Sequence, residues 1–453
     1  MKRRVVITGL GPVSGLGLGI GPTWEAAAAG RSAIARIDAF NPAGFGCHIG
    51  SQVRDFSVRD FVPKSYRKAT KVMASDIEFA VAAAHLAAKD ADLHTAGTDA
   101  ELVGTADFKP TYDPARVGCH IGSGLIAAEV NELTAALSEA RDESGQFSMH
   151  KWGREGITHL TPLWLLKYLP NMLACHVTIL HDAQGPSNTI TCAEASAMLS
   201  IGESLRVIQR GSADLCFCGG AEDKLNPMAF LRQMFTQRLN TTSNDAPTSA
   251  VRPFDASAAG MVIGQGGAIV TLEAYDTFVS RREAASDSAV RAYAEVAGFG
   301  ASQSVHIPGK NRTPDPNGRG IALAIRAALR EAQITPEQID LIVPFGVGVP
   351  EYDQAEAAAL FSVFGNRAKE VPLVSTKPLV GNCYAGVGGI DVCIAAKAIA
   401  EQMIPATTNC DKPLNGMNAK TQASRAAKLN YVLTYSVGFG GQNAALVLKR
   451  FEG

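Results

Sequence analysis

The feature of this sequence that most constrains its fold is an order of elements that occurs twice. In the first half, an alanine-rich, helix-like stretch over 78–89 leads to an apolar run over 117–124 that ends in glycines. In the second half, a helix-like stretch over 321–332 leads to an apolar run over 339–346 that also ends in glycine. Alternation of helices with short apolar strands is the α/β pattern.

The repeated order continues along the chain. A strand-like segment ends at Cys192 and turns into a helix-like stretch over 194–209, and a strand follows over 213–218. In the second half a strand-like segment ends at 374–377, and a glycine-rich turn opens a helix over 388–401. We therefore predict two similar α/β halves, residues 1–273 and 274–453. Chance similarity between two α/β segments is the alternative.

Composition excludes several classes of protein. Of the 453 residues, 46% are hydrophobic and 19% charged, which predicts a large buried core and argues against disorder. A net charge of −1 gives no reason to expect a nucleic-acid partner. No run approaches about 20 apolar residues, so no membrane insertion is expected. Nine cysteines, an odd number, indicate a reducing compartment, and we expect a cytoplasmic protein.

Two short patterns could suggest a bound metal or nucleotide. Cys216 and Cys218 form a C-x-C pattern. Because they lie in an apolar run, alternation on a buried strand explains this spacing better than a pair of metal ligands does. Gly9 and Gly11 open a glycine-rich loop that lacks the third glycine of a dinucleotide fingerprint. The sequence therefore predicts neither a metal nor a cofactor.

Cys192 is the strongest candidate for a reactive group. It lies where the strand-like segment over 188–191 meets a helix-like stretch. At a helix N-terminus, free N–H groups and the helix dipole favour a thiolate, and hydrolase folds present nucleophiles on such turns. The alternative is a small buried thiol, which is the expected role of most of the other cysteines.

Six motifs, in order, resemble those of elongating β-ketoacyl-acyl-carrier-protein synthases. They lie at residues 5–11, 191–192, 218–222, 252–266, 375–377 and 438–443. The resemblance implies the thiolase-like fold, in which two βαβ-rich halves stack helices between and outside mixed sheets. It also implies a dimer, either a homodimer or a heterodimer with a related ketosynthase.

The resemblance further implies a chemistry for named residues. Cys192 would take an acyl group from an acyl carrier protein, whose phosphopantetheine arm carries acyl or malonyl units. The backbone N–H groups of Cys192 and Phe439 would form the oxyanion hole, with Phe439 also acting as a gate. Lys377 and Glu356 would brace the site.

Two positions depart from the family pattern. Phe345 and Asn382 stand where the resemblance places histidines, and all nine histidines of the chain lie at or before His306. Asparagine can still donate a hydrogen bond to a thioester or enolate oxygen, whereas phenylalanine cannot. Loss of such a donor typically lowers a rate by about 10²–10⁴. We expect malonyl decarboxylation to be weak and acyl transfer onto Cys192 to survive.

Glu194 is a third departure, because relatives carry a small neutral residue two positions after the cysteine. It could provide ordinary helix-capping electrostatics or act as a substitute base. Three functions remain open: a condensing 3-oxoacyl-acyl-carrier-protein synthase of fatty acid or polyketide-type biosynthesis, an acyltransferase of the same fold, and a non-catalytic partner subunit. Retention of Cys192 argues against the third.

Overall fold

A mixed ten-stranded β-sheet runs through both halves of the chain in the computed structural model, which describes residues 2–285, 290–305 and 314–452. Its strand order is β11-β14-β15-β10-β1-β9-β7-β5-β6, with β2 paired to β1. The first-half strands are β1 (Val5–Ser14), β2 (Gly17–Leu18), β5 (Val117–Gly122), β6 (Ser187–Ile190), β7 (Leu215–Glu222) and β9 (Gly266–Ala274). The second-half strands are β10 (Ala294–Gln303), β11 (Leu341–Val343), β14 (Tyr431–Val437) and β15 (Gln442–Lys449).

The sheet repeats its own topology. In the first half, β1–β9 and β9–β7 are antiparallel and β7–β5 is parallel. In the second half, β10–β15 and β15–β14 are antiparallel and β14–β11 is parallel. The two sets meet where β1 pairs with β10 through two residue pairs, Val6 with Glu295 and Ile7 with Ala294. This confirms the thiolase-like α/β fold of two similar halves. The division at 273/274 stays a prediction; β9 ends at Ala274.

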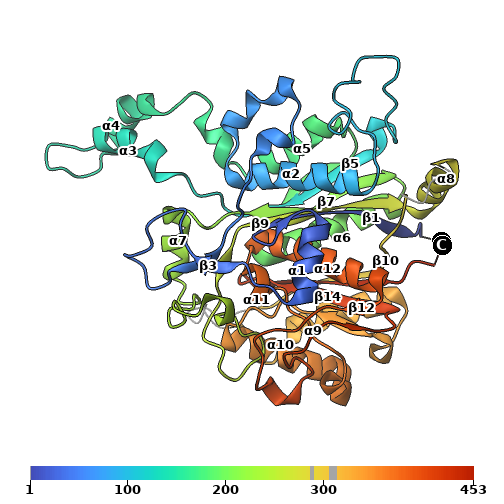
Figure 1. The fold of residues 1–453 in the computed structure, drawn as a ribbon. Coiled ribbons are helices and arrows are strands. Elements are labelled where there is room, and N and C mark those ends of the chain that lie inside the picture. The colour runs from blue at the N-terminus through green and yellow to red at the C-terminus, as the bar shows by residue number, and fades with distance from the viewer. Residues whose placement is uncertain (1, 286–289, 306–313, 453) are drawn as a thin grey trace.

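Helices form three layers around these strands (Figure 1). Helices α2 (Ser75–Asp90) and α5 (Met172–His181) cover the first-half strands, and α9 (Arg319–Ala332) and α10 (Pro350–Phe364) lie on the second-half side. Between the halves lie α6 (Ser196–Gln209) and α12 (Val387–Glu401), which contact each other and strands of both halves. Because both of its sides meet strands, α12 is apolar almost all round and nearly every one of its residues is buried.

Paired glycines allow the outer helices to approach the strands closely. A Cβ at Gly9 or Gly11 of β1 would lie 2.1 or 2.0 Å from a backbone oxygen of α2. A Cβ at Gly298 or Gly300 of β10 would lie 2.2 or 2.0 Å from a backbone oxygen of α9. The glycine pair that opens the sequence therefore serves helix packing, and the second half has the same device.

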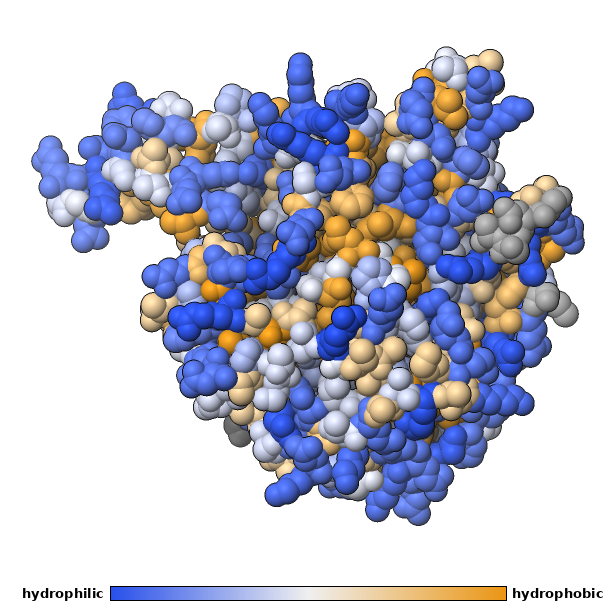
Figure 2. Space-filling view, viewed as in Figure 1, coloured by the Kyte–Doolittle hydropathy of each residue, from blue (hydrophilic) through white to orange (hydrophobic). Residues whose placement is uncertain are grey.

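The remaining elements surround this body. The helices are α1 (Ile20–Ala29), α3 (Val130–Glu139), α4 (Met149–Arg154), α7 (Pro227–Met234), α8 (Tyr275–Ala285) and α11 (Lys377–Val380). The strands are β3 (Ile34–Arg36), β4 (Ile49–Ser51) and β8 (Ile263–Gly264), which form one small sheet, and the pair β12 (Met403–Ile404) and β13 (Arg425–Ala426). Helices α3 and α4 form an arm that projects from the body (Figure 1). Figure 2 shows a mostly polar lower half on this face, with apolar side chains gathered across its middle.

The predicted elements agree with the structure at most positions. The helix-like stretches over 78–89, 194–209, 321–332 and 388–401 correspond to α2, α6, α9 and α12. The predicted strand end at 374–377 is wrong: a single bridge joins Leu373 to Ile342, and α11 begins at Lys377. Pro378 explains the change, because proline fits the first turn of a helix and cannot donate to a strand ladder.

The expectations about membrane insertion, the cysteines and metal binding can each be compared with the described residues. No helix in the described part of the chain is long and apolar enough to span a bilayer. Cys216 and Cys218 are buried on β7, and all nine cysteines are free thiols. Across 2–285, 290–305 and 314–452, no cluster of three His, Cys, Asp or Glu side chains could hold a metal ion.

Candidate functional site

Cys192 lies on a tight turn between β6 and α6. It caps the single 3-10 turn η7 (Ala193–Ala195), and Ala193 adopts a positive φ of 50°. The α-helix itself begins only at Ser196, so the thiol lies one turn before α6 rather than on its first residue. The thiol is half-buried, and this burial raises the pKa of Cys192. The net direction is thus opposite to the lowering expected from a helix N-terminus.

The second half contains a matching turn. Cys383 caps the 3-10 turn η11 (Tyr384–Gly386), Tyr384 has a φ of 45°, and α12 follows. The two turns, η7 and η11, pack against each other. Cys383 is fully buried, its Sγ lies 3.4 Å from the carbonyl oxygen of Gln265, and burial raises the pKa of this thiol strongly. Its surroundings are those of a structural thiol.

The loop after β14 brings Phe439 to the Cys192 turn. Gly438 lies so close that a Cβ there would be 3.2 Å from the carbonyl oxygen of Cys192. The Phe439 ring packs edge-on against Phe345, with centroids 6.0 Å apart, and against Tyr352, with centroids 4.7 Å apart. The Arg238 guanidinium lies 4.3 Å from the centre of the Phe439 ring. The structure thus brings Phe345, Phe439 and the Cys192 turn together.

Both backbone amides implied for the oxyanion hole already have acceptors. The N–H of Cys192 donates to Oγ of Ser196 over 2.8 Å. The N–H of Phe439 donates to Oε2 of Glu194 over 3.0 Å. The contact between Phe439 and Glu194 could not be predicted from the sequence, because it joins residues 245 positions apart.

Glu194 is a fully buried carboxyl on the Cys192 turn. Burial raises the pKa of Glu194 to about 7, while the Phe439 N–H and the nearby Arg238 act in the opposite direction. In the part of the chain that the structure describes, no hydrogen bond joins this carboxyl to the thiol of Cys192. Its contact with Phe439 was not expected from the sequence, whereas its own backbone N–H on the η7 turn favours the carboxylate as helix-end electrostatics would.

Lys377 is held by a fully buried ion pair. Its Nζ lies 2.5 Å from Oδ2 of Asp391 and 3.1 Å from the carbonyl oxygen of Pro344. The same Nζ lies 5.5 Å from the centre of the Phe345 ring. Sequence reasoning missed Asp391, although a single carboxylate within the apolar stretch over 388–400 is a recognisable signal of a buried partner.

Two carboxyls of α10 hold the loop that carries Phe345. Glu356 accepts the N–H of Gly346 at 3.0 Å with both oxygens, and Asp353 accepts the N–H of Gly348 at 3.2 Å. Both carboxyls are buried, and burial raises the pKa of each. Glu356 therefore positions the Phe345 loop.

Asn382 is engaged within its own turn. Its Oδ1 accepts the N–H of Tyr384 at 2.9 Å, and its Nδ2 lies 3.5 Å from the sulfur of Met261. The side chain is fully buried. A donor role towards an enolate oxygen would require Nδ2 to leave the Met261 sulfur.

A cavity of about 520 Å³ lies beside the two turns. Thr191, Ala193, Glu194, Tyr384 and Phe439 contribute to its wall. Its charged lining also includes Arg238 and the ion-paired Glu222 and Lys224. Sequence reasoning gave these three residues and Tyr384 no role in the site: Glu222 ends the motif at 218–222, the others lie outside the six motifs, and all four meet only in the folded chain. The cavity gives an acyl thioester a place next to the nucleophile turn.

Comparison with known proteins agrees with this geometry. Residues 2–277 match the family model of the β-ketoacyl synthase N-terminal domain, and residues 293–411 match the β-ketoacyl synthase C-terminal domain. Similar relatives are the 3-oxoacyl-[acyl-carrier-protein] synthase 2 of Vibrio cholerae, 30% identical over 455 residues, and that of Coxiella burnetii, 32% identical over 454 residues. Each alignment covers 99% of both chains.

Solved structures show the same similarity across the whole chain. The ishigamide ketosynthase/chain length factor superposes with a TM-score of 0.81 at 26% identity, and a β-ketoacyl synthase from Burkholderia phymatum with 0.79 at 26%. Both comparisons cover 100% of each chain. By its sequence, its fold and the Cys192 turn, this chain belongs to the β-ketoacyl synthase family.

Proposed function

We propose that this protein is a condensing-type acyltransferase that carries an acyl group on Cys192, in fatty acid or polyketide-type biosynthesis. The observation that carries the proposal is the strained turn that sets Cys192 beside the 520 Å³ cavity and under the Phe439 loop. In the acylation step the Cys192 thiolate attacks the thioester carbonyl carbon. A new Sγ–C bond forms, the bond to the pantetheine sulfur breaks, and the released thiolate takes up a proton.

This site supports the second half-reaction, the decarboxylative condensation with a malonyl unit, less well than the acylation of Cys192. Decarboxylation of a malonyl unit needs groups that stabilise the enolate, and Phe345 offers only an apolar ring. Asn382 has an amide donor, but that amide contacts the Met261 sulfur. We therefore propose slow condensation alongside retained acyl transfer. An acyltransferase without condensation is the second candidate, favoured by the same two residues.

The thioester donor in this proposal is an acyl carrier protein. The relatives' names include this carrier, and the cavity could admit the end of its phosphopantetheine arm. We also propose that the chain works as a dimer, either with itself or with a related ketosynthase, in the cytoplasm. Support comes from the unpaired outer edge of β6 and from the ketosynthase/chain length factor pair among the similar structures. A partner subunit without catalysis would keep this pairing and lose acylation.

The test is the mass of the intact protein after incubation with an acyl-loaded carrier protein. Wild type should gain the mass of the acyl group, and Cys192→Ala should not. Cys410→Ala provides a matched control, because this buried thiol lies outside the cavity wall. An adduct that persists in Cys192→Ala, or is lost in Cys410→Ala, would contradict the assignment.

A further inference from the structure

The Glu194 carboxyl lies in the position that a reacting thioester oxygen would need. An amide N–H has one hydrogen, and that of Phe439 is directed at Oε2 of Glu194 over 3.0 Å. The oxygen of a tetrahedral intermediate must accept from the same kind of backbone donor. A carboxylate is a charged acceptor and binds an N–H more strongly than a neutral thioester carbonyl does. The incoming substrate and Glu194 therefore compete for one donor.

Both sides of this contact are held in place. Glu194 lies on the η7 turn, whose backbone is fixed by the Cys192-to-Ser196 hydrogen bond and the positive φ of Ala193. The Phe439 ring is fixed by Arg238 on its face and Tyr352 at its edge. The contact therefore joins a turn held by local hydrogen bonds to a ring that is packed on its face and at its edge.

A second buried group offers the carboxyl another partner. The hydroxyl of Tyr384 is buried and has no hydrogen-bond partner in the described part of the chain. Tyr384 and Glu194 line the same cavity, and the two groups interact electrostatically. An unpartnered buried hydroxyl is unfavourable, so a donor at this place indicates that an acceptor reaches it in another state of the site.

We propose that Glu194 is a displaceable plug of the oxyanion hole. In the resting protein its carboxyl accepts the Phe439 N–H, and when a thioester enters, the carboxyl turns to the Tyr384 hydroxyl and frees the amide. Glu194 and Tyr384 then decide together how readily Cys192 is acylated. This inference rests on the proposed acyl-enzyme at Cys192.

The protonation state of Glu194 sets the strength of the plug. The charged groups that face it are Arg238, which favours the carboxylate, and Glu222, which opposes it; the hydroxyls of Tyr352 and Tyr384 also lie nearby. Since the pKa of Glu194 is about 7, the carboxyl is mostly neutral below that pH and mostly charged above it. The plug should therefore strengthen as pH rises through about 7.

The first experiment compares acylation with alkylation of Cys192. Iodoacetamide needs the thiolate but no oxyanion hole, whereas acyl transfer needs both. Glu194→Ser should raise the rate of acyl-adduct formation about tenfold or more, while changing alkylation less than about threefold. Glu203→Ser, which removes a half-buried carboxyl further along α6, should change neither rate. The proposal would be overturned if wild type and Glu194→Ser were alkylated at equal rates and also formed the acyl adduct at equal, measurable rates.

Two further variants test the switch itself. Glu194→Gln keeps an acceptor for Phe439 but no charge, so above pH 7 its acylation should lie between that of wild type and that of Glu194→Ser, and it should lose the additional change near pH 7. Tyr384→Phe should slow acylation when Glu194 is present and have little effect in the Glu194→Ser background. Additive effects of Tyr384→Phe and Glu194→Ser would contradict a shared switch.

Amide hydrogen exchange separates this inference from the proposed function. The segment containing Phe439 should exchange faster in Glu194→Ser than in wild type or Glu203→Ser, whether or not Cys192 is ever acylated. If this difference appears and no variant forms an adduct although all are alkylated, the hydrogen bond between Glu194 and Phe439 is confirmed, while the acyl-enzyme proposal fails and with it the role of the plug in acylation. If adducts form and the exchange is unchanged, the plug is wrong and the acyl-enzyme proposal stands.

Discussion

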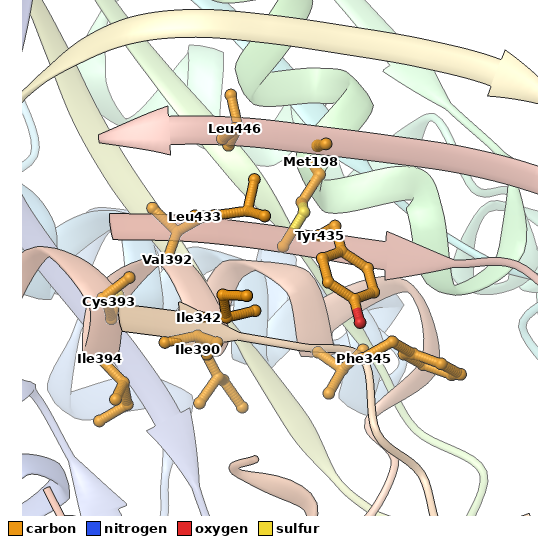
Figure 3. Packing of buried hydrophobic residues seen from close by; sticks show 14 of the residues in the cluster. Met198, Ile342, Phe345, Ile390, Val392, Cys393, Ile394, Leu433, Tyr435 and Leu446 are labelled. Atoms are coloured by element: carbon orange, nitrogen blue, oxygen red, sulfur yellow. The ribbon is translucent and has the colours of Figure 1, made fainter. Parts of the chain in front are cut away.

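Phe345 is the residue whose replacement should tell most about the chemistry. Its ring packs edge-on against Phe439, and the Lys377 ammonium lies 5.5 Å from its centre, so it fills the space between the two. Figure 3 shows it at the end of the buried cluster around Tyr435 and Ile342. Because histidine is smaller than phenylalanine and carries donors and acceptors, it can enter this space without overpacking.

The expected result of Phe345→His is faster release of carbon dioxide from malonyl-loaded carrier protein. The imidazole would supply a proton donor that the wild-type site lacks. Asn382→His should give little gain, because asparagine already carries an amide donor at this position. The assay runs beside acyl exchange on the same preparations. Fast decarboxylation by the wild type would show that another group already performs this role.

The buried ion pair of Lys377 and Asp391 leads to a prediction on stability. Asp391→Asn leaves an ammonium buried without its counter-charge, which should lower the free energy of unfolding by about 3–5 kcal/mol. The double variant Lys377→Met with Asp391→Asn should recover part of this loss. Urea unfolding measures both. A single variant as stable as wild type would mean that water reaches this pair.

At the scale of elements, Asp255 joins two distant loops. Its carboxylate accepts the N–H groups of Asp411 at 2.6 Å, Lys412 at 2.7 Å and Ser257 at 2.8 Å. Burial acts against ionisation, but these donors prevail and hold the pKa of Asp255 well below its usual value. The loop before β8 and the loop between β12 and β13 are therefore fixed to each other.

We expect Asp255→Ala to lower the free energy of unfolding by about 1–3 kcal/mol, because three partly buried N–H groups lose their charged acceptor. A carboxyl whose pKa is depressed on folding stabilises the protein above its unfolded pKa, and this contribution fades as pH falls through the folded value. The difference between wild type and Asp255→Ala should thus be full at pH 7 and shrink in acid. Asp411→Asn, at an exposed carboxylate, serves as the control in the same melts.

The elements themselves were largely predictable because their signals are local. The strand-to-helix turn at Cys192 follows from the β-branched run over 189–191, a small residue and an alanine-rich helix, all within about 15 residues. The bond between Glu194 and Phe439 and the placement of Arg238 were not predictable, since they join segments that only tertiary packing brings together. The direction of the Cys192 pKa was missed for the same reason: burial depends on the second half.

For the whole molecule, the outer edge of β6 is the first place to look for a partner. β6 pairs in parallel with β5 on one side, while its N-terminal residues Ser187 and Asn188 are exposed. The outward N–H of Thr189 is met by the side chain of Asn188 at 2.8 Å. A free strand edge invites pairing with another chain.

We therefore expect a dimer in light scattering at micromolar concentration, and a shift to monomer in Thr189→Pro. Proline removes an N–H that β5 does not use, so the subunit itself should remain folded. Thr189→Val keeps that N–H and is the matched control. A wild-type monomer would contradict self-association at this edge and leave pairing with a related chain to be tested by mixing.

The hydrogen bond between Glu194 and Phe439 is one of several contacts that join the two halves of the duplicated chain, beside the β1–β10 pairs and the bond from Gly264 to Asn382. Whatever displaces Glu194 removes a cross-link between these halves while adding contacts of its own. A ligand that displaces Glu194 therefore weakens one contact between the two halves while it adds contacts elsewhere. Acylation of Cys192 should raise the melting temperature of wild type less than that of Glu194→Ser, in which the cross-link is already absent.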